Sequence, residues 1–226
     1  MSRIESDHEP DTGNAREICA LIPAAGRSRR MGRPKLLLPL GERKVIDWLL
    51  DALQNAGMRH VSLLARMDDV ELVDAVQDRT MMIVQPVEDP PDMRTSVEHL
   101  LDEAYDRLHP EPDDGWMLIP ADHPVLSETL IRMMCRAWQS CTADVLVPEY
   151  DGRRGHPTIF RWSLAGRVAA IPSDRGLNWM LHQPDVTVDA IPSSDPLVLA
   201  DMDTPEDYAR LQALVKQDDE HPGRQD

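Results

Sequence analysis

The chain has 226 residues, a length that suits one α/β domain with a sizeable core. Its 40 acidic residues outnumber its 24 lysines and arginines, giving a formal net charge of −16. This balance argues against a nucleic-acid partner, because phosphate backbones are bound by surplus positive charge. No apolar run is long enough to cross a bilayer and the N-terminus lacks the apolar core of a signal peptide, so we expect a cytoplasmic protein without a membrane partner. Both ends are polar, which predicts disordered tails at residues 1–16 and 217–226 around one domain at 17–216.

An apolar run at residues 18–22 predicts a buried strand, and a loop of small and basic residues follows it. Residues 24–35 read A-A-G-R-S-R-R-M-G-R-P-K. The small residues let backbone N–H groups approach a ligand closely, and cations of the minority charge can hold phosphates. A triphosphate-binding loop is therefore predicted, with a basic solvated turn as the alternative; the spacing fits neither a Walker loop nor a dinucleotide fingerprint. The residues concerned are Ala24, Ala25, Gly26, Arg27, Ser28, Arg29, Arg30, Arg33 and Lys35.

Helical and strand patterns alternate after this loop, which predicts a mostly parallel sheet covered on both faces. The resulting fold is a single-domain, three-layer, Rossmann-like α/β fold. The predicted helices are 45–56, ended by Gly57, then 68–77 and 95–108, which begins at Thr95 or Ser96. The predicted strands are 60–65, 81–84 and 116–119.

The strand at 116–119 delivers P-A-D-H-P, residues 120–124, to the carboxyl edge of the sheet, where ligands bind in open α/β folds. Asp122 lies between two prolines, so its carboxylate is held at a fixed place relative to the first loop. The alternative is that Asp122 caps the helix predicted at 127–140, although Ser127 is better placed for that purpose.

Two further polar motifs follow. After a strand at 144–147 and a turn at Asp151-Gly152, His156 stands in R-R-G-H-P beside Arg153 and Arg154, which could meet another phosphate; a purely structural histidine is the alternative. A helix is predicted at 174–181, and strands at 185–191 and 197–200. They lead to D-M-D-T-P-E-D at 201–207. A helix start with Thr204 as N-cap accounts for every residue of this motif that has a role in capping, but not for Asp201 and Asp203.

In this order, the motifs resemble those of the molybdenum cofactor cytidylyltransferase family, nucleotidyltransferases that attach a nucleotide to molybdopterin. The resemblance implies a fold like that of nucleotide-diphospho-sugar transferases. It implies that Asp122 binds the Mg²⁺ that bridges the nucleotide phosphates, joined by Asp203 in preference to Asp201. It further implies that the acceptor is bound by Arg154, Gly155, His156, Pro157, Arg175 and Gly176.

The implied reaction is magnesium-dependent transfer of a nucleoside monophosphate from CTP to the phosphate of molybdopterin, with Arg30, Lys35 and Asp122 as catalytic residues. CTP is expected because family members with two alanines at the place of Ala24-Ala25 tend to use it. Arg94, Thr95 and Ser96 are the candidates for base contacts, although the family tends to have glycine and serines there. The alternatives are a sugar-phosphate or polyol-phosphate nucleotidyltransferase, and a noncatalytic nucleotide- or cofactor-binding chaperone for a client molybdoenzyme.

Overall fold

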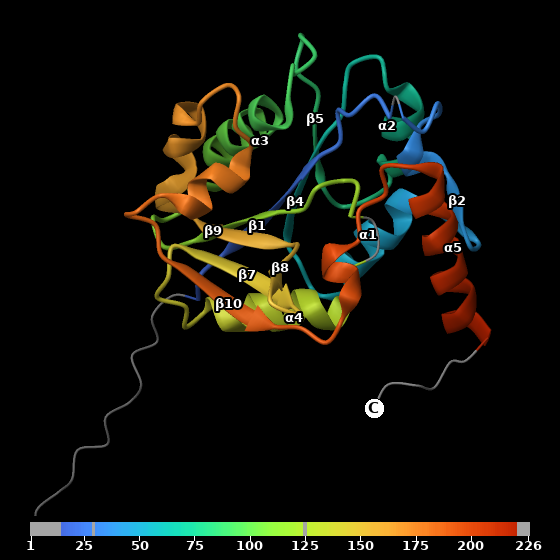
Figure 1. The fold of residues 1–226 in the computed structure, drawn as a ribbon. Coiled ribbons are helices and arrows are strands. Elements are labelled where there is room, and N and C mark those ends of the chain that lie inside the picture. The colour runs from blue at the N-terminus through green and yellow to red at the C-terminus, as the bar shows by residue number, and fades with distance from the viewer. Residues whose placement is uncertain (1–14, 29, 124–125, 221–226) are drawn as a thin grey trace, which may run out of the picture.

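The computed structural model describes residues 15–28, 30–123 and 126–220. Within these residues, eight strands form a sheet in the order β10-β7-β9-β6-β1-β4-β5, with β8 paired to β7 (Figure 1). Neighbouring strands are parallel except around β9 and β8, so the predicted mostly parallel sheet is confirmed. The strands are β1 (Ile18–Pro23), β4 (His60–Leu64), β5 (Met82–Val84), β6 (Gly115–Leu118), β7 (Val145–Tyr150), β8 (Arg153–Arg154), β9 (Thr158–Arg161) and β10 (Val188–Pro192).

Helices cover both faces of the sheet, which gives the expected three layers (Figure 1). The α-helices are α1 (Val45–Asn55), α2 (Val70–Val76), α3 (Met93–Leu108), α4 (Glu128–Trp138) and α5 (Pro205–Glu220). The 3-10 helices are η1 (Lys35–Leu37), η2 (Trp162–Ala170), η3 (Leu177–His182) and η4 (Pro196–Leu199), and a small antiparallel pair is formed by β2 (Pro39–Leu40) and β3 (Arg43–Lys44). The side chains of α3 and η2 share one apolar core, while those of α1, α4 and α5 share the other.

The central strand β1 explains why its sequence is continuously apolar. Ala20 and Ile22 enter the core beneath α1 and α4, while Cys19 and Leu21 enter the core beneath α3. Successive side chains on a strand point to opposite faces, so a strand covered on both sides needs apolar residues at every position. Full burial of each large side chain contributes about 1.5–3 kcal/mol, which anchors the loop that follows β1.

Two predicted elements near the C-terminus are wrong in type. Of the strand predicted at 197–200, residues 197–199 belong to η4, because Asp195 accepts a hydrogen bond from the N–H of Leu197 at 2.8 Å and Pro196 supplies a helical first residue. A short apolar run does not by itself distinguish a strand from a helix. In place of the helix predicted at 174–181, the structure has the 3-10 helix η3 at residues 177–182, which begins after Gly176.

Other boundaries shift. The helix predicted from Thr95 begins at Met93, because Asp92 is its N-cap and accepts a hydrogen bond from the N–H of Thr95 at 2.8 Å. The strand predicted from residue 185 begins at Val188, since the N–H of Val186 still closes a turn onto the carbonyl of Gln183.

The domain limits of 17 and 216 stay a prediction, and described structure continues on both sides of them. Arg16, assigned to the N-terminal tail, donates hydrogen bonds to the carbonyls of Trp138 and Cys141 at 2.8 and 2.6 Å. At the other end, α5 continues to Glu220. The remaining tail residues, 1–14 and 221–226, lie outside the described part of the chain. Among the described residues, no helix has both the length and the apolar character needed to cross a bilayer.

Candidate active site

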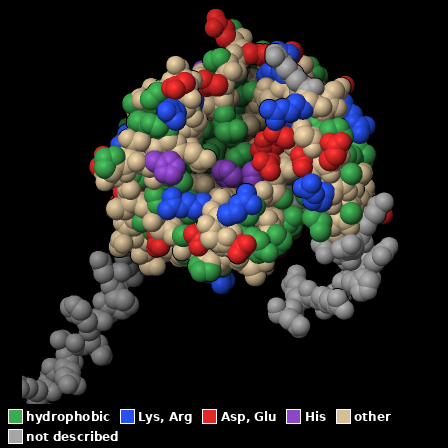
Figure 2. Space-filling model, in the orientation of Figure 1, with side chains coloured by type: hydrophobic (Ala, Val, Ile, Leu, Met, Phe, Trp, Pro, Cys, Tyr) green, Lys and Arg blue, Asp and Glu red, His purple; other side chains and the backbone are tan. Residues whose placement is uncertain are grey.

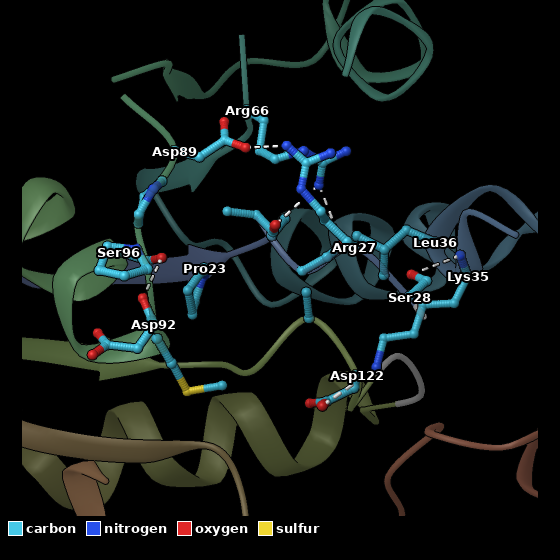
Figure 3. A pocket seen from close by; sticks show the side chains of 17 residues that line it. Pro23, Arg27, Ser28, Lys35, Leu36, Arg66, Asp89, Asp92, Ser96 and Asp122 are labelled. Carbon is cyan, nitrogen blue, oxygen red and sulfur yellow. Dashed lines mark hydrogen bonds and ion pairs between the residues drawn. The ribbon is translucent and has the colours of Figure 1, made fainter. Parts of the chain in front are cut away.

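A cavity of about 520 Å³ lies at the carboxyl ends of the parallel strands β1, β4, β5 and β6. This is the edge at which open α/β sheets bind ligands. The face of the molecule shown in Figure 2 is hollowed, and histidine, acidic and basic side chains gather beside the hollow. The lining residues are Pro23, Ala24, Ala25, Gly26, Arg27, Ser28, Lys35, Leu36, Arg66, Asp89, Pro90, Pro91, Asp92, Met93, Ser96, Ala121 and Asp122 (Figure 3).

The loop after β1 lines this cavity, as the small residues of the sequence predict. A methyl group added to Gly26 would meet no other atom within 4 Å, so the space beside this glycine is open. Ser28 has a positive φ of 48°, its carbonyl accepts hydrogen bonds from the N–H groups of Met31 and Gly32, and its hydroxyl accepts one from the N–H of Lys35. These bonds close the loop and direct Lys35 back toward the cavity.

Lys35 contacts two loops that are far apart in the sequence, one with Asp122 and one with Met202 and Asp203. Its side chain is 14% exposed, and its Nζ lies 3.4 Å from Oδ2 of Asp122, 3.1 Å from Oδ1 of Asp203 and 3.0 Å from the carbonyl of Met202. The side chain of Arg30, by contrast, is 77% exposed, and its guanidinium lies 3.0 Å from Oδ2 of Asp203. Asp203 therefore meets both predicted catalytic cations, whereas Asp201 is exposed. Arg29 lies outside the described residues.

Asp122 is held in its charged form. Burial by itself would raise the pKa of this carboxyl, but the adjacent His123 and the ammonium of Lys35 outweigh burial and lower the pKa to about 2. The alternative role of Asp122 as a helix cap is wrong, since the hydroxyl of Ser127 accepts the hydrogen bond from the N–H of Leu130. Met202 instead donates its N–H to the carbonyl of Asp122 at 2.8 Å, which ties the two acidic loops together.

The oxygen atoms around Lys35 have the donor chemistry that a divalent cation requires. Two carboxylates and one carbonyl converge there, and these hard donors suit Mg²⁺ or Mn²⁺. In the described ranges, no three His, Cys, Asp or Glu side chains form a complete metal cage. Mg²⁺ is usually bound by one or two carboxylates together with substrate phosphates, so Asp122 and Asp203 match that manner of binding.

His156 approaches the site from the R-R-G-H-P motif. Its ring packs edge-on against that of His123, with 4.6 Å between the ring centroids. Burial lowers the pKa of His156 to about 4, helped by His123 and opposed by Asp122, so the imidazole is neutral at neutral pH. The adjacent Gly155 has a structural explanation, because a Cβ there would lie 2.2 Å from the carbonyl oxygen of Val198.

The other predicted site residues divide into two groups. Ser96 lines the cavity, but the N–H and hydroxyl of Thr95 are bonded to Asp92, and Arg94 donates to the carbonyl of Ile171 at 2.7 Å. In the acceptor motifs, Pro157 is buried while Arg154, Arg175 and Gly176 are exposed. Arg154 lies on β8, and the guanidinium of Arg175 faces its own neighbour Asp174 at 3.6 Å.

Three charged residues of the cavity were not predicted from the sequence: Arg66, Asp89 and Asp92. Arg66 follows β4 and Asp89 follows β5, so their position after parallel strands was the available signal. Asp89 forms an ion pair with Arg27 (Figure 3). Arg27 also lies 3.4 Å from Asp68. Asp92 lines the cavity while capping α3.

Known proteins resemble this chain in sequence and in fold. A 2-C-methyl-D-erythritol 4-phosphate cytidylyltransferase of Synechococcus elongatus is 30% identical over 170 residues, which cover 73% of this chain and 68% of the relative. The structure of Rv0371c from Mycobacterium tuberculosis, in complex with manganese, is 27% identical with a TM-score of 0.69, covering 87% of this chain and 98% of that one. Molybdopterin-guanine dinucleotide biosynthesis protein A of Archaeoglobus fulgidus is 14% identical with a TM-score of 0.65, covering 88% and 98%, and thus shares the fold.

The model of the MobA-like NTP transferase domain matches residues 20–190, a range that includes most of β1, the loop after it, Asp122 and the R-R-G-H-P motif. The chain therefore belongs to the family of MobA-like NTP transferase domains and is a nucleotidyltransferase of that kind.

Proposed function

We propose that this protein transfers cytidine monophosphate from CTP to the phosphate of molybdopterin, with Mg²⁺ as cofactor and pyrophosphate as the second product. The observation that carries the proposal is the position of Lys35, between Asp122 and Asp203 and beside the open glycine loop. A mostly buried ammonium at the cavity, in contact with two carboxylates, suits a triphosphate accompanied by a metal ion.

The reaction requires no protein nucleophile. An oxygen of the acceptor phosphate attacks the α-phosphorus of CTP, and the bond from that phosphorus to the oxygen bridging the β-phosphorus breaks. The bridging oxygen keeps the electron pair and leaves in pyrophosphate. Because a phosphate monoester is already ionised at neutral pH, catalysis comes from in-line positioning and from neutralisation of the charge that develops.

The chain's own residues would supply both effects. Lys35 would exchange part of its contact with Asp122 and Asp203 for phosphate oxygens, and the N–H groups of the loop at 25–28 would hold the same oxygens. Because its pKa is lowered to about 2, Asp122 is a carboxylate at neutral pH. Mg²⁺ held by Asp122, Asp203 and the phosphates would neutralise negative charge on the reacting group.

Two features of the chain support CTP and molybdopterin. Ala24 and Ala25 line the cavity, and their methyl groups leave less room for a purine than glycines would. Steric crowding of this kind discriminates by about 1–3 kcal/mol. His156, neutral and beside His123, supports an acceptor site next to Asp122 at which Arg153 and Arg154 would meet a second phosphate.

A polyol phosphate is the second candidate acceptor, and the cytidylyltransferase of Synechococcus elongatus is the observation that favours it. The two acceptors differ in size and chemistry, because molybdopterin is a large pterin and the polyol phosphate is small. Both require the loop at 24–35 and Asp122, so these residues do not distinguish the candidates.

The test offers each acceptor separately with Mg²⁺ and CTP and follows pyrophosphate release. We expect release with molybdopterin, no release with 2-C-methyl-D-erythritol 4-phosphate, and a loss of at least about 100-fold in Asp122→Asn. Release with the polyol phosphate alone would replace the proposed acceptor. If CTP bound tightly without any release, the protein would be a noncatalytic binding protein.

A further inference from the structure

Arg66 is the most fully bonded cation at the cavity. It follows β4 at the carboxyl edge of the sheet, and its side chain is only 12% exposed. One nitrogen, NH1, donates to the carbonyls of Ala25 and Gly26 at 2.9 and 3.3 Å. Nε donates to Asp68 at 2.9 Å, and NH2 lies 3.2 Å from a carboxylate oxygen of Asp69. Figure 3 shows Arg66 beside the loop that carries Arg27.

These contacts fix the direction of two peptide groups in the loop. A trans peptide is planar, and its N–H points opposite to its C=O. Because the carbonyls of Ala25 and Gly26 point toward Arg66, the N–H groups of Gly26 and Arg27 point away from it. In the part of the chain that the structure describes, neither N–H forms a hydrogen bond. Both residues line the cavity, so these donors are available to a ligand there.

The charge of Arg66 is already balanced. Asp68 and Asp69 each contact its guanidinium, and their carboxylates offset its positive charge, so Arg66 is poorly suited to bind a phosphate directly. Only a planar guanidinium can contact two carbonyls and two carboxylates at once, because it presents five donors in a fixed fork. The arrangement therefore suits the orientation of a backbone better than the direct binding of an anion.

We propose that Arg66 is a positioning residue, which orients the N–H groups of Gly26 and Arg27 so that they bind the triphosphate. The ligand named here rests on the proposed function. The role assigned to Arg66 concerns the free protein, in which the loop is already held before any nucleotide arrives.

The test compares Arg66→Lys and Arg66→Ala with Arg161→Lys as a matched control. Arg161 is 11% exposed and also bridges two carbonyls, those of Cys141 and Ala143, to a carboxylate, that of Asp113. It pairs with Gly115 at the start of β6, on the opposite edge of the sheet. Steady-state kinetics and isothermal titration with Mg²⁺ and CTP give KM, kcat and Kd, and ¹⁵N relaxation without nucleotide gives the order of the amides of Gly26 and Arg27.

For both Arg66 variants we expect KM and Kd for CTP to rise about tenfold or more, with kcat within about twofold of wild type. The two amides should lose order in the nucleotide-free variants. Arg161→Lys should change none of these values, even where its thermal stability falls as much as that of Arg66→Lys.

Two results would overturn the proposal. Wild-type affinity in Arg66→Lys would mean that a positive charge suffices at this place. Weakened binding with unchanged amide order would mean that Arg66 contacts the nucleotide itself. Failure of the wild-type protein to bind CTP, GTP or ATP would instead remove the proposed function, and the amide measurement, which needs no nucleotide, would still decide whether Arg66 orients the loop.

Discussion

Lys35 and Arg30 are both predicted from the sequence as catalytic cations, but they differ in burial. Lys35 is mostly buried and has three oxygen partners, whereas Arg30 is mostly exposed and, among the described residues, pairs with Asp203 alone. An exposed ion pair contributes about 0–1 kcal/mol, while a preorganised buried charge can stabilise a transition state by about 3 kcal/mol. The two residues should therefore differ in their importance for turnover.

We predict that Lys35→Ala lowers kcat/KM for pyrophosphate release about 100-fold, and that Arg30→Ala lowers it less than about fivefold. Steady-state assays at saturating Mg²⁺ measure both values. Thermal unfolding of each variant serves as the control, because Lys35→Ala leaves Asp122 and Asp203 without their shared partner. Equal losses in the two variants would mean that burial does not rank these cations.

A substitution at Gly26 tests where the triphosphate binds without disturbing the fold. A methyl group at this position meets nothing within 4 Å, and the residue does not have the positive φ that favours glycine. Gly26→Ala should keep the wild-type midpoint of thermal unfolding but raise KM for CTP about tenfold, because the methyl group occupies space that the phosphates need. Gly166→Ala, also free of close contacts, is the matched control. A wild-type KM in Gly26→Ala would place the triphosphate elsewhere.

His156 makes stability depend on pH in a defined window. Its pKa is about 4 in the folded chain, against an ordinary value of 6.5, so the unfolded chain takes up the proton first as the pH falls. The free energy of unfolding therefore falls between pH 6.5 and about 4, by about 3 kcal/mol from this residue.

His156→Gln should flatten that part of the pH dependence, because glutamine has no proton to take up. Urea unfolding at pH 7 and pH 4 measures the free energies from which the dependence follows. A variant whose stability still fell by the same amount as that of wild type would show that His156 is not the group responsible.

At the scale of elements, the start of α5 positions Asp203. The hydroxyl of Thr204 accepts a hydrogen bond from the N–H of Asp207, while the carboxylate of Asp207 accepts bonds from the N–H groups of Asp203 and Thr204. This reciprocal cap confirms the helix start expected at Thr204 and fixes the backbone of the acid that contacts Lys35.

Thr204→Ala should lower stability by about 1 kcal/mol and also reduce kcat, because the cap and the orientation of Asp203 are lost together. Ser127→Ala is the control: it removes the cap of α4, a helix without a predicted site residue, and should reduce stability alone. Chemical denaturation and pyrophosphate release separate the two effects. Unchanged kcat in a destabilised Thr204→Ala would remove the link between this cap and Asp203.

For the whole molecule, the sequence predicts those features that depend on neighbouring residues in the chain. The sheet, the loop at 24–28 and Asp122 follow from apolar runs and from residues that immediately follow strands. The contact of Lys35 with Asp203 joins residues 168 positions apart, and that of Arg66 with Ala25 joins residues 41 positions apart. No local pattern carries such pairings. Arg94 illustrates the same limit, since its partner is the carbonyl of Ile171.

The most direct test of the account is a competition among nucleotides. The enzyme is incubated with Mg²⁺, molybdopterin and equal concentrations of CTP, GTP and ATP, and the dinucleotide product is identified by mass spectrometry. We predict a molybdopterin cytidine dinucleotide, formed together with an equal amount of pyrophosphate. A guanosine or adenosine product would contradict the assignment of CTP, and the absence of any dinucleotide would contradict transfer to molybdopterin.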